Sequence, residues 1–387
     1  PTWQSSSNCI SGSCLSFDTS AWKYIEVPDS SSTDIRTNLT LEAWIYPRGS
    51  GGSEGVSTIL VSGGNGYYLS FSDSSNALSC YWYGKSPEGY HTTGSNTITR
   101  NTWNHVVCAW DATTLKQYIN GNLVKTTSVT GTGTGSTFIN IGAETANRQF
   151  DGRIDEVRIY NRTLSPLEIE QHYISQAPGP VAYWKLDEGE GTTAYDNSGN
   201  GNNGTLKNGP TWQSSSNCIS GSCLSFDGSD DYIDCGNAAT ITNVFTVEAW
   251  AQVATTSIST IVGTRAPGDC SFDMKFQAGN LIHGDIGNGS SWITIAADAN
   301  FPYNLNTWYY IVHVVTQTGY SIYVNGTQIR SGTYSTASPV FSDSNHKIAI
   351  GAVGTTGGEY FNGLIDEVRI YNRALLPSEI EQHYISR

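Results

Sequence analysis

The sequence predicts an all-β protein of two tandem antiparallel β-sandwich, or jelly-roll, domains, each with one short C-terminal helix. One observation is a long internal repeat, whose matching pairs of segments are 1–18 with 210–227, 155–162 with 366–373, and 168–175 with 379–386. A second observation is that nearly every apolar segment is short, alternating, and rich in β-branched and aromatic residues. Such segments are typical of strands.

The spacing of the repeat defines the domains. A repeat of about 210 residues has the size of one complete domain and is too large for a solenoid unit. We therefore predict one domain at 1–176 and a second at 177–387. The second has an upstream piece, 181–209, before its copy of PTWQ, whereas the first begins at PTWQ.

Each element has its own local pattern. The clearest predicted strands are TLEAWIY (40–46), NHVVCAW (104–110), LKQYING (115–121), SIYVNG (321–326) and EVRIYN (156–161). Asn-Gly at 120–121 and 325–326 predicts two-residue hairpin turns, because both residues tolerate positive φ. SPLEIEQHY (165–173) predicts a helix, with Ser165 as N-cap, Pro166 at the first position and Glu168 closing a capping box.

Charge and hydropathy exclude two classes of partner. The formal net charge is −14, which repels phosphate backbones and anionic lipid, so we expect no nucleic-acid partner. No apolar run approaches the roughly 18 residues that a membrane helix needs, so we expect no membrane span. No signal peptide is visible at the start. We expect Pro1 to be either a processed end or a fragment boundary.

Eight cysteines, four in each domain, lack the CxxC spacing of zinc sites. Two pairs flank the short turn ISGS, and the others would bridge separate strands. We predict four disulfides, namely Cys9–Cys14, Cys218–Cys223, Cys80–Cys108 and Cys235–Cys270. The alternative of buried free thiols in a cytosolic protein is less favoured, so the pattern indicates an oxidising, extracellular compartment.

An ordered series of segments resembles a known family. The segments are VAYWKLDEGEGTTAYDNSGNGNNGTL, CLSFDGSDDYIDCG, FTVEAW, NTWYYIVHVV, YVNG and LIDEVRIYNRALLPSEI. In this order they resemble the laminin-G-like jelly roll of the concanavalin A-like lectin/glucanase superfamily, in two tandem copies of which the first lacks its N-terminal strand. The resemblance implies two stacked antiparallel sheets, often with one bound Ca²⁺, in modules that bind carbohydrate or protein outside cells.

The sequence does not predict catalysis. Glycosidases of this fold place carboxylates at alternate positions of one strand, so that they share a face. Here Asp155 and Glu156 are adjacent, as are Asp366 and Glu367, and we expect each pair to point to opposite faces. No Ser-His-Asp or Cys-His motif is recognisable. We therefore assign no catalytic residue and expect a protein that is not an enzyme.

The strongest metal candidate is the loop DNSGNGNNG (196–204). Its carbonyls and side-chain oxygens could offer the hard ligands that Ca²⁺ prefers, with Asp196, Asn197, Asn200 and Asn202 as side-chain candidates. The resemblance adds Asp366 as a ligand. We predict one Ca²⁺ in the second domain and none in the first, and a plain turn with Asn at positive φ remains the alternative.

The candidate carbohydrate-binding residues lie in the aromatic segment CYWYGKSPEGYH (80–91). We select Trp82, Tyr83 and Tyr90 there, and Trp292 in the second domain, because aromatic faces stack on sugar rings. Trp82 alternates with its tyrosine neighbours, so one side of this strand faces the core. Core filling is the alternative interpretation.

The missing first strand suggests a further interaction. In the fold that the sequence resembles, the first and last strands lie side by side, so 181–188 should pair with 364–372. The strand at 153–161 should then have an open edge, which is a template for a strand from a neighbouring copy or from upstream sequence. We expect a non-catalytic extracellular adhesion or recognition protein at the cell surface. The alternative is a structural subunit of a filament or surface layer, assembled by β-strand complementation at this edge.

Overall fold

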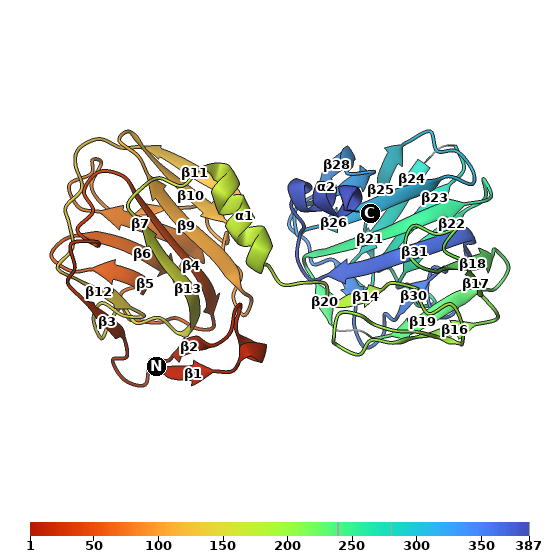
Figure 1. Ribbon diagram of the computed structural model, residues 1–387, viewed down its shortest axis with the longest axis horizontal. Helices are drawn as coiled ribbons and strands as arrows, with labels where there is room; N and C mark the ends of the chain where they lie inside the picture. The colour runs from red at the N-terminus through yellow and green to blue at the C-terminus, as the bar shows by residue number, and fades with distance from the viewer. Residues whose placement is uncertain (238–239, 280, 387) are drawn as a thin grey trace. The chain divides into compact units, whose positions relative to one another are not determined.

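The computed structural model describes residues 1–237, 240–279 and 281–386 (Figure 1). The chain divides into two compact units, unit 1 at Pro1–Pro178 and unit 2 at Gly179–Arg387. Each unit contains two main antiparallel sheets and ends with one short helix, so the predicted fold class is confirmed. The division lies close to the predicted one between 176 and 177.

Unit 1 has a first sheet of seven strands, and a short 3₁₀ turn, Ser6–Asn8, joins two of them. In spatial order they are β1 (Thr2–Gln4), β2 (Cys14–Phe17), β13 (Gly152–Tyr160), β4 (Leu39–Pro47), β9 (Asn104–Trp110), β10 (Thr114–Ile119) and β11 (Asn122–Ser128). The second sheet has six, in the order β3 (Ile25–Pro28), β12 (Phe138–Ile141), β5 (Val56–Ser62), β6 (Tyr67–Ser72), β7 (Ala77–Trp82) and β8 (His91–Thr92).

The core of unit 1 lies between these sheets. The central strand β4 places Leu39, Leu41, Ala43 and Ile45 in it at alternate positions, all fully buried, as a strand with a period of two requires. Its opposite face is buried too, because helix α1 (Pro166–Gln176) lies over it and stacks Tyr173 on Trp44.

Helix α1 begins as its sequence predicts. The Ser165 hydroxyl accepts a hydrogen bond from the Glu168 N–H at 3.2 Å, and the Glu168 carboxylate accepts one from the Ser165 N–H at 2.9 Å. This reciprocal arrangement is the predicted capping box, and Pro166 occupies the first turn. The helix ends at Gln176, three residues beyond the predicted end at 173.

Unit 2 repeats this plan with added strands. Its first sheet has the order β17 (Thr211–Gln213), β18 (Cys223–Asp227), β31 (Asn362–Tyr371), β21 (Phe245–Val253), β26 (Trp308–Val315), β27 (Gly319–Val324) and β28 (Thr327–Thr333), with β14 (Ala182–Trp184) also paired to β31. The second has the order β15 (Thr193–Ala194), β16 (Gly204–Lys207), β19 (Tyr232–Gly236), β30 (Ile348–Ile350), β22 (Ser259–Gly263), β23 (Phe272–Gln277), β24 (Leu281–Gly287) and β25 (Trp292–Asn300). A small third sheet joins β20 (Ile241–Thr242) to β29 (Val340–Ser342), and helix α2 spans Pro377–Ile385.

Both predicted Asn-Gly turns are confirmed. Asn120 and Gly121 have φ of 50° and 75°, and Asn325 and Gly326 have φ of 51° and 77°. Two successive residues with positive φ form the turn whose twist matches that of the flanking strands.

Three of the four predicted disulfides are confirmed: Cys9–Cys14, Cys80–Cys108 and Cys218–Cys223. The prediction of Cys235–Cys270 is wrong, because both residues are free thiols. Cys235 lies on β19, whereas Cys270 precedes β23, and β30 and β22 lie between these strands. Strands are about 4.8 Å apart, so the two backbones are too distant for a bond that needs Cα atoms within about 7 Å.

The two units differ at their first strand. In unit 2, β14 pairs with β31 through Ala182 opposite Ile370, Tyr183 opposite Arg369 and Trp184 opposite Val368. The pairing predicted between 181–188 and 364–372 is therefore confirmed for Ala182–Trp184 with Val368–Ile370. In unit 1, whose residues are all described, no strand takes the place of β14 beside β13.

Candidate functional site

The outer face of the second sheet of unit 1 carries four tyrosines, Tyr68, Tyr81, Tyr83 and Tyr90, which we call the tyrosine cluster. Tyr68 on β6 lies directly opposite Tyr81 on β7. The ring centroids of Tyr81 and Tyr83 are 4.6 Å apart, and those of Tyr81 and Tyr90 are 5.3 Å apart. Tyr68 is nearly buried, whereas the other three rings are half-buried. The cluster therefore offers a continuous aromatic surface with access to solvent.

Trp82 does not belong to this surface. Its side chain is only 1% exposed, and its indole N–H donates to the Thr134 carbonyl at 3.0 Å. It packs edge-on against Trp110 in the core. Assigning Trp82 to ligand binding was wrong, because strand alternation turns it inward while its neighbours Tyr81 and Tyr83 face out. A binding role for Tyr83 and Tyr90 stays a prediction.

A charged rim borders the tyrosine cluster. Glu144 and Arg148 lie between β12 and β13, where Arg148 donates to Glu144 at 2.9 Å and to the Tyr90 hydroxyl at 3.0 Å. Glu144 also accepts from the Tyr68 hydroxyl at 3.0 Å. The guanidinium of Arg148 lies 5.9 Å from the Tyr90 ring centroid, within reach of a cation–π contact. These polar groups stand where they could bind the hydroxyls of a stacked sugar.

The hydroxyls of Tyr81 and Tyr90 stay protonated over the physiological range. Burial, together with the neighbouring Tyr83, raises the pKa of Tyr81 to about 12. Burial likewise raises the pKa of Tyr90 to about 12, even though Arg148 opposes the shift. Each hydroxyl can therefore both donate and accept a hydrogen bond.

Sequence reasoning missed Tyr68, Glu144 and Arg148. Tyr68 has a local signal, because the alternation of β6 mirrors that of β7 and would place Tyr68 beside Tyr81. The position of Arg148 has no local signal, since its loop reaches the cluster only after the strands have assembled.

Unit 2 has charges on the corresponding face. Asp273 lies opposite Asp285 in the same register as Tyr68 opposite Tyr81. The Lys275 ammonium is 3.3 Å from Asp273, 3.3 Å from Asp285 and 2.8 Å from Glu359. Burial raises the pKa of Asp273 to about 6 despite Lys275. Asp273, His283 and Asp285 are close enough to share a metal, but Lys275 supplies a positive charge there.

Trp292, the residue selected in unit 2, lies beside this charged face at the start of β25. Its side chain is half-buried, and the Arg265 guanidinium lies 5.1 Å from its ring centroid. Arg265 in turn is 3.3 Å from Asp273. The role of Trp292 in binding stays a prediction.

The predicted calcium loop is held by its own hydrogen bonds. The Asp196 carboxylate accepts from the backbone N–H of Tyr183, Ser198 and Asn202 at 2.8–3.0 Å. The side-chain amides of Asn200 and Asn202 donate to the Val181 carbonyl, and that of Asn197 donates to the Tyr195 carbonyl.

Asp366, the fifth predicted ligand, has other partners. Its carboxylate accepts from the N–H of Ile219 and Ser220 at 2.9 and 3.1 Å, and burial raises its pKa to about 8. Its other oxygen, Oδ1, is buried and has no hydrogen-bond partner in the described structure. Calcium binding by these five residues stays a prediction.

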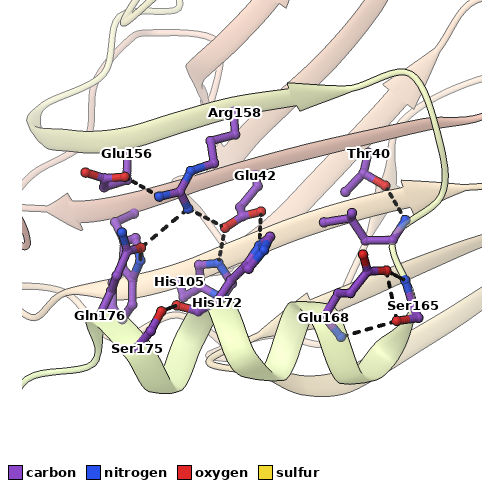
Figure 2. Close-up of polar contacts among 12 residues, drawn as sticks. Thr40, Glu42, His105, Glu156, Arg158, Ser165, Glu168, His172, Ser175 and Gln176 are labelled. Atoms are coloured by element: carbon purple, nitrogen blue, oxygen red, sulfur yellow. Dashed lines mark hydrogen bonds and ion pairs between the residues drawn. The ribbon is translucent and has the colours of Figure 1, made fainter.

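The most deeply buried carboxylate of unit 1 has a structural role. Glu42 on β4 is 3.0 Å from each of His105, His172 and Arg158 (Figure 2). Burial opposes its ionisation, but the hydrogen bonds and charge of the two histidines outweigh this and lower the pKa of Glu42 to about 2. His172 belongs to α1, so this network fastens the helix to the sheet. Unit 2 repeats it with Glu248, Arg369 and His383.

The adjacent carboxylates Asp155 and Glu156 lie at a bulge. Glu156 has φ of 49°, and the pairing of β13 with β4 shifts at this point, so the simple alternation used in the prediction does not apply there. The Asp155 carboxylate accepts from the N–H of Ile10 and Ser11 at 2.9 and 3.1 Å, and Glu156 forms an ion pair with Arg158. Both carboxylates are thus engaged in holding strands and loops.

The described ranges contain no helix that is long and apolar enough to cross a membrane. No curated protein matches the sequence. Among solved structures, the chain is similar to domain 4 of an extracellular arabinanase from Geobacillus stearothermophilus, in complex with arabinotriose. The identity is 22% and the TM-score 0.41, over 52% of this chain and 97% of that one.

Two further solved structures are similar to the chain. Domains LG4-5 of the mouse laminin α1 chain match with 12% identity and a TM-score of 0.31, over 94% of this chain and 91% of that one. A Trypanosoma rangeli sialidase in complex with sialic acid matches with 13% identity and a TM-score of 0.41, over 86% of this chain and 62% of that one. These similarities concern the fold alone.

The sequence profile of one family covers most of both units, at residues 19–170 and 227–381. The matched regions contain most strands of the two sandwiches, from β3 to β13 and from β19 to β31, and the first turn of the helix packed on each. The ordered segments, the paired sheets and this match agree, and the chain belongs to the concanavalin A-like lectin/glucanases superfamily.

Proposed function

We propose that this protein is a non-catalytic extracellular adhesion or recognition protein at the cell surface, and that unit 1 binds carbohydrate through the tyrosine cluster. The observation that carries the proposal is the group of rings within 4.6–6.3 Å of one another on an outer sheet face. Aromatic faces favour sugar rings because both present apolar surfaces of matching size. Arg148 and Glu144 supply the polar groups that orient such a ligand.

Two observations support the remaining parts of the proposal. Three disulfides favour an oxidising compartment. The buried or paired carboxylates Glu42, Asp155 and Glu156 are committed to structural contacts, so they are not available as an acid–base pair beside a substrate. The charged face of unit 2 would give that unit a different ligand or a protein partner.

The experiment is a glycan array followed by calorimetric titration of the best ligand. Tyr81→Ala should reduce affinity by about tenfold, since an aromatic contact contributes roughly 0.5–1.5 kcal/mol beyond its buried area and a tenfold change corresponds to about 1.4 kcal/mol. The matched control is Tyr195→Ala in unit 2, a 56% exposed tyrosine outside the cluster, which should leave affinity unchanged. Equal affinity in the two variants, with both folded, would count against the proposal.

A second candidate function is a structural subunit of an extracellular filament or surface layer, assembled by β-strand complementation. It is favoured by the open edge of β13, where Val157 and Ile159 are only half-buried while their counterparts Val368 and Ile370 are fully buried beside β14. Electron microscopy of the purified chain tests it, and the expected result is regular fibres or sheets. Dispersed single particles at all concentrations would oppose it.

A further inference from the structure

A groove runs along the open edge of unit 1. It has a volume of about 190 Å³ and is lined by Trp3, Ser13, Leu15, Phe17, Ile154 and Val157, among others. Trp3 is 73% exposed, an unusual state for a tryptophan. On this side, β13 pairs with β2 only through Gly152–Ile154. The structure describes unit 1 completely, and no strand of unit 1 pairs with residues 157–159 on the β2 side of β13.

Unit 2 contains the same groove with its occupant in place. The counterparts of the six lining residues are identical in type: Trp212, Ser222, Leu224, Phe226, Ile365 and Val368. In unit 2, Ala182, Trp184 and Leu186 lie in one buried cluster with four of these residues, Leu224, Phe226, Ile365 and Val368, and the half-buried Trp212 packs against it. Leu224 is fully buried there, whereas Leu15 is half-buried. Because the groove residues are the same, the two units differ at this groove only in whether the segment 182–186 or its equivalent fills it.

The segment that follows β14 completes the contact. Asp187 accepts from the Ser222 N–H at 3.0 Å, and the Gly191 carbonyl accepts from the Trp212 indole at 2.9 Å. In unit 1, Ser13 and Trp3 occupy the positions of Ser222 and Trp212 and offer the same two hydrogen-bond donors. On the outer side, Arg369 donates to the Tyr183 hydroxyl at 2.7 Å and covers its ring at 4.1 Å. Unit 1 retains this arginine as Arg158, and it also retains the ion pair to Glu156.

We infer that the groove of unit 1 binds an extended polypeptide segment of the sequence type Val-Ala-Tyr-Trp-Lys-Leu-Asp, supplied from outside residues 1–178. By the register of unit 2, the alanine lies opposite Ile159, the tyrosine opposite Arg158 and the tryptophan opposite Val157. The tryptophan and leucine of the bound segment fill the groove, and its tyrosine stacks on Arg158. Its aspartate accepts a hydrogen bond from the Ser13 N–H. This is β-strand addition, in which backbone hydrogen bonds give affinity and alternate side chains give specificity.

A second copy of this chain is a poorer donor. Releasing residues 181–187 from one unit 2 would open the groove that they already fill, so an exchange would empty one groove for each groove that it occupies. The inference deepens the second candidate function and rests on the same open edge, but it does not require that the chain polymerises.

The test uses the full chain and a synthetic peptide of residues 180–192. The expected result is one bound peptide per chain and slower hydrogen exchange at 157–160, by about tenfold with the peptide at ten times its Kd. Exchange at 368–371 should not change. The matched control is the same peptide with its tryptophan and leucine replaced by serine, which should not bind.

A grafted chain provides a second measurement. Placing a copy of residues 181–209 directly before Pro1 reproduces the spacing of unit 2, where Gly209 precedes Pro210. The graft should raise the melting temperature of unit 1 and abolish peptide binding. Failure of the peptide to bind, together with a graft that changes neither quantity, would overturn the inference. A native dimer with 157–160 already protected and 181–187 exposed would overturn it in favour of exchange between copies. Absence of filaments in microscopy would count against the second candidate function. It would not affect this inference, which is tested by peptide binding.

Discussion

The ionised Glu42 side chain shows how one residue can hold a helix on a sheet. It is fully buried, and its three partners come from β9, β13 and α1. A buried carboxylate is tolerated only when its oxygens are paired in this way, because the cost of removing its water is otherwise too large. Unit 2 keeps the carboxylate and the helix histidine but replaces His105 by Tyr310, whose hydroxyl donates to Glu248 at 2.7 Å.

Acid should weaken unit 1 through Glu42. The pKa of Glu42 is about 2 in the folded protein and 4.5, the ordinary value, in the unfolded chain. The stabilisation that ionised Glu42 provides is therefore present above pH 4.5 and is lost as the pH falls towards 2. The difference corresponds to about 3 kcal/mol. Urea unfolding at pH 7 and pH 3 should show about 2 kcal/mol of this loss in the wild type, because pH 3 still lies above the folded pKa, and a smaller pH dependence in Glu42→Gln. The control is Glu26→Gln on the exposed face of β3. A pH dependence that is unaltered by Glu42→Gln would contradict the prediction.

The two free thiols should differ in reactivity. Cys235 is buried, and burial raises its pKa well above the usual value, so the reactive thiolate is both scarce and poorly accessible. Cys270 is half-buried. We expect a thiol reagent to label Cys270 in the native protein and Cys235 only after unfolding. The variant Cys270→Ser should therefore remain unlabelled under native conditions, and rapid labelling of that variant would show the prediction to be wrong.

At the scale of elements, individual contacts that a single substitution can remove hold helix α1 and the loop at 196–204 in place. The capping box of α1 satisfies two backbone donors that a helix start otherwise leaves unpaired. The loop at 196–204 is held by the Asp196 carboxylate. The bridge Cys80–Cys108 links β7 to β9 and therefore joins the two sheets of unit 1.

Ser165→Ala should lower the unfolding free energy of unit 1 by about 1 kcal/mol, because an N-cap hydroxyl is lost. The matched control lies in the same helix: Ser175→Ala removes a hydroxyl that bonds only the His172 carbonyl at 3.1 Å, and it should cost less than about 0.5 kcal/mol. Denaturant unfolding measures both. Equal losses would mean that the cap contributes nothing specific.

Asp196→Ala should destabilise unit 2 with or without calcium, because the carboxylate holds three backbone N–H groups. The expected loss is about 2–3 kcal/mol. Thermal unfolding in EDTA and in CaCl₂ measures it. A wild-type protein that is stabilised by calcium, with a variant that is not, would instead identify the loop as the predicted calcium site.

At the scale of the whole molecule, two units with almost identical ends differ in completeness. Unit 2 carries its first strand, which buries Trp184 and Leu186, whereas unit 1 leaves the corresponding groove open. Buried apolar area is the main stabilising contribution of a domain, so the open unit should be the weaker one.

Calorimetry of the full chain should show two transitions, with unit 1 unfolding first. Trp184→Ala should lower the unfolding free energy of unit 2 by about 3–5 kcal/mol, the usual cost of truncating a buried aromatic residue, and bring the two transitions together. Tyr195→Ala, at an exposed position of the same segment, should leave both in place. Hydrogen exchange assigns the transitions, and a unit 2 that unfolds first in the wild type would refute the prediction.

Local patterns in the sequence were enough to determine the fold class, the tandem organisation and several individual features. The repeat marked the two units, the Asn-Gly pairs marked hairpin turns, and Ser165 with Glu168 marked the start of α1. These features depend on residues within a few positions of one another, so the sequence displays them directly. The pairing of 181–188 with 364–372 also followed, through the family resemblance.

Only the tertiary structure decided which distant residues meet. The Cys235–Cys270 bridge was predicted from parity and separation, but two strands lie between the partners. Trp82 was grouped with Tyr83, and although the sequence shows that the two alternate, only the packing of β7 in the sandwich places Trp82 in the core and Tyr83 on the surface. The meeting of Tyr68, Tyr90 and Arg148 required the order of the strands and the path of the β12–β13 loop. These outcomes depend on strand order and register, which long-range packing of the whole sandwich selects and which no local stretch of sequence encodes.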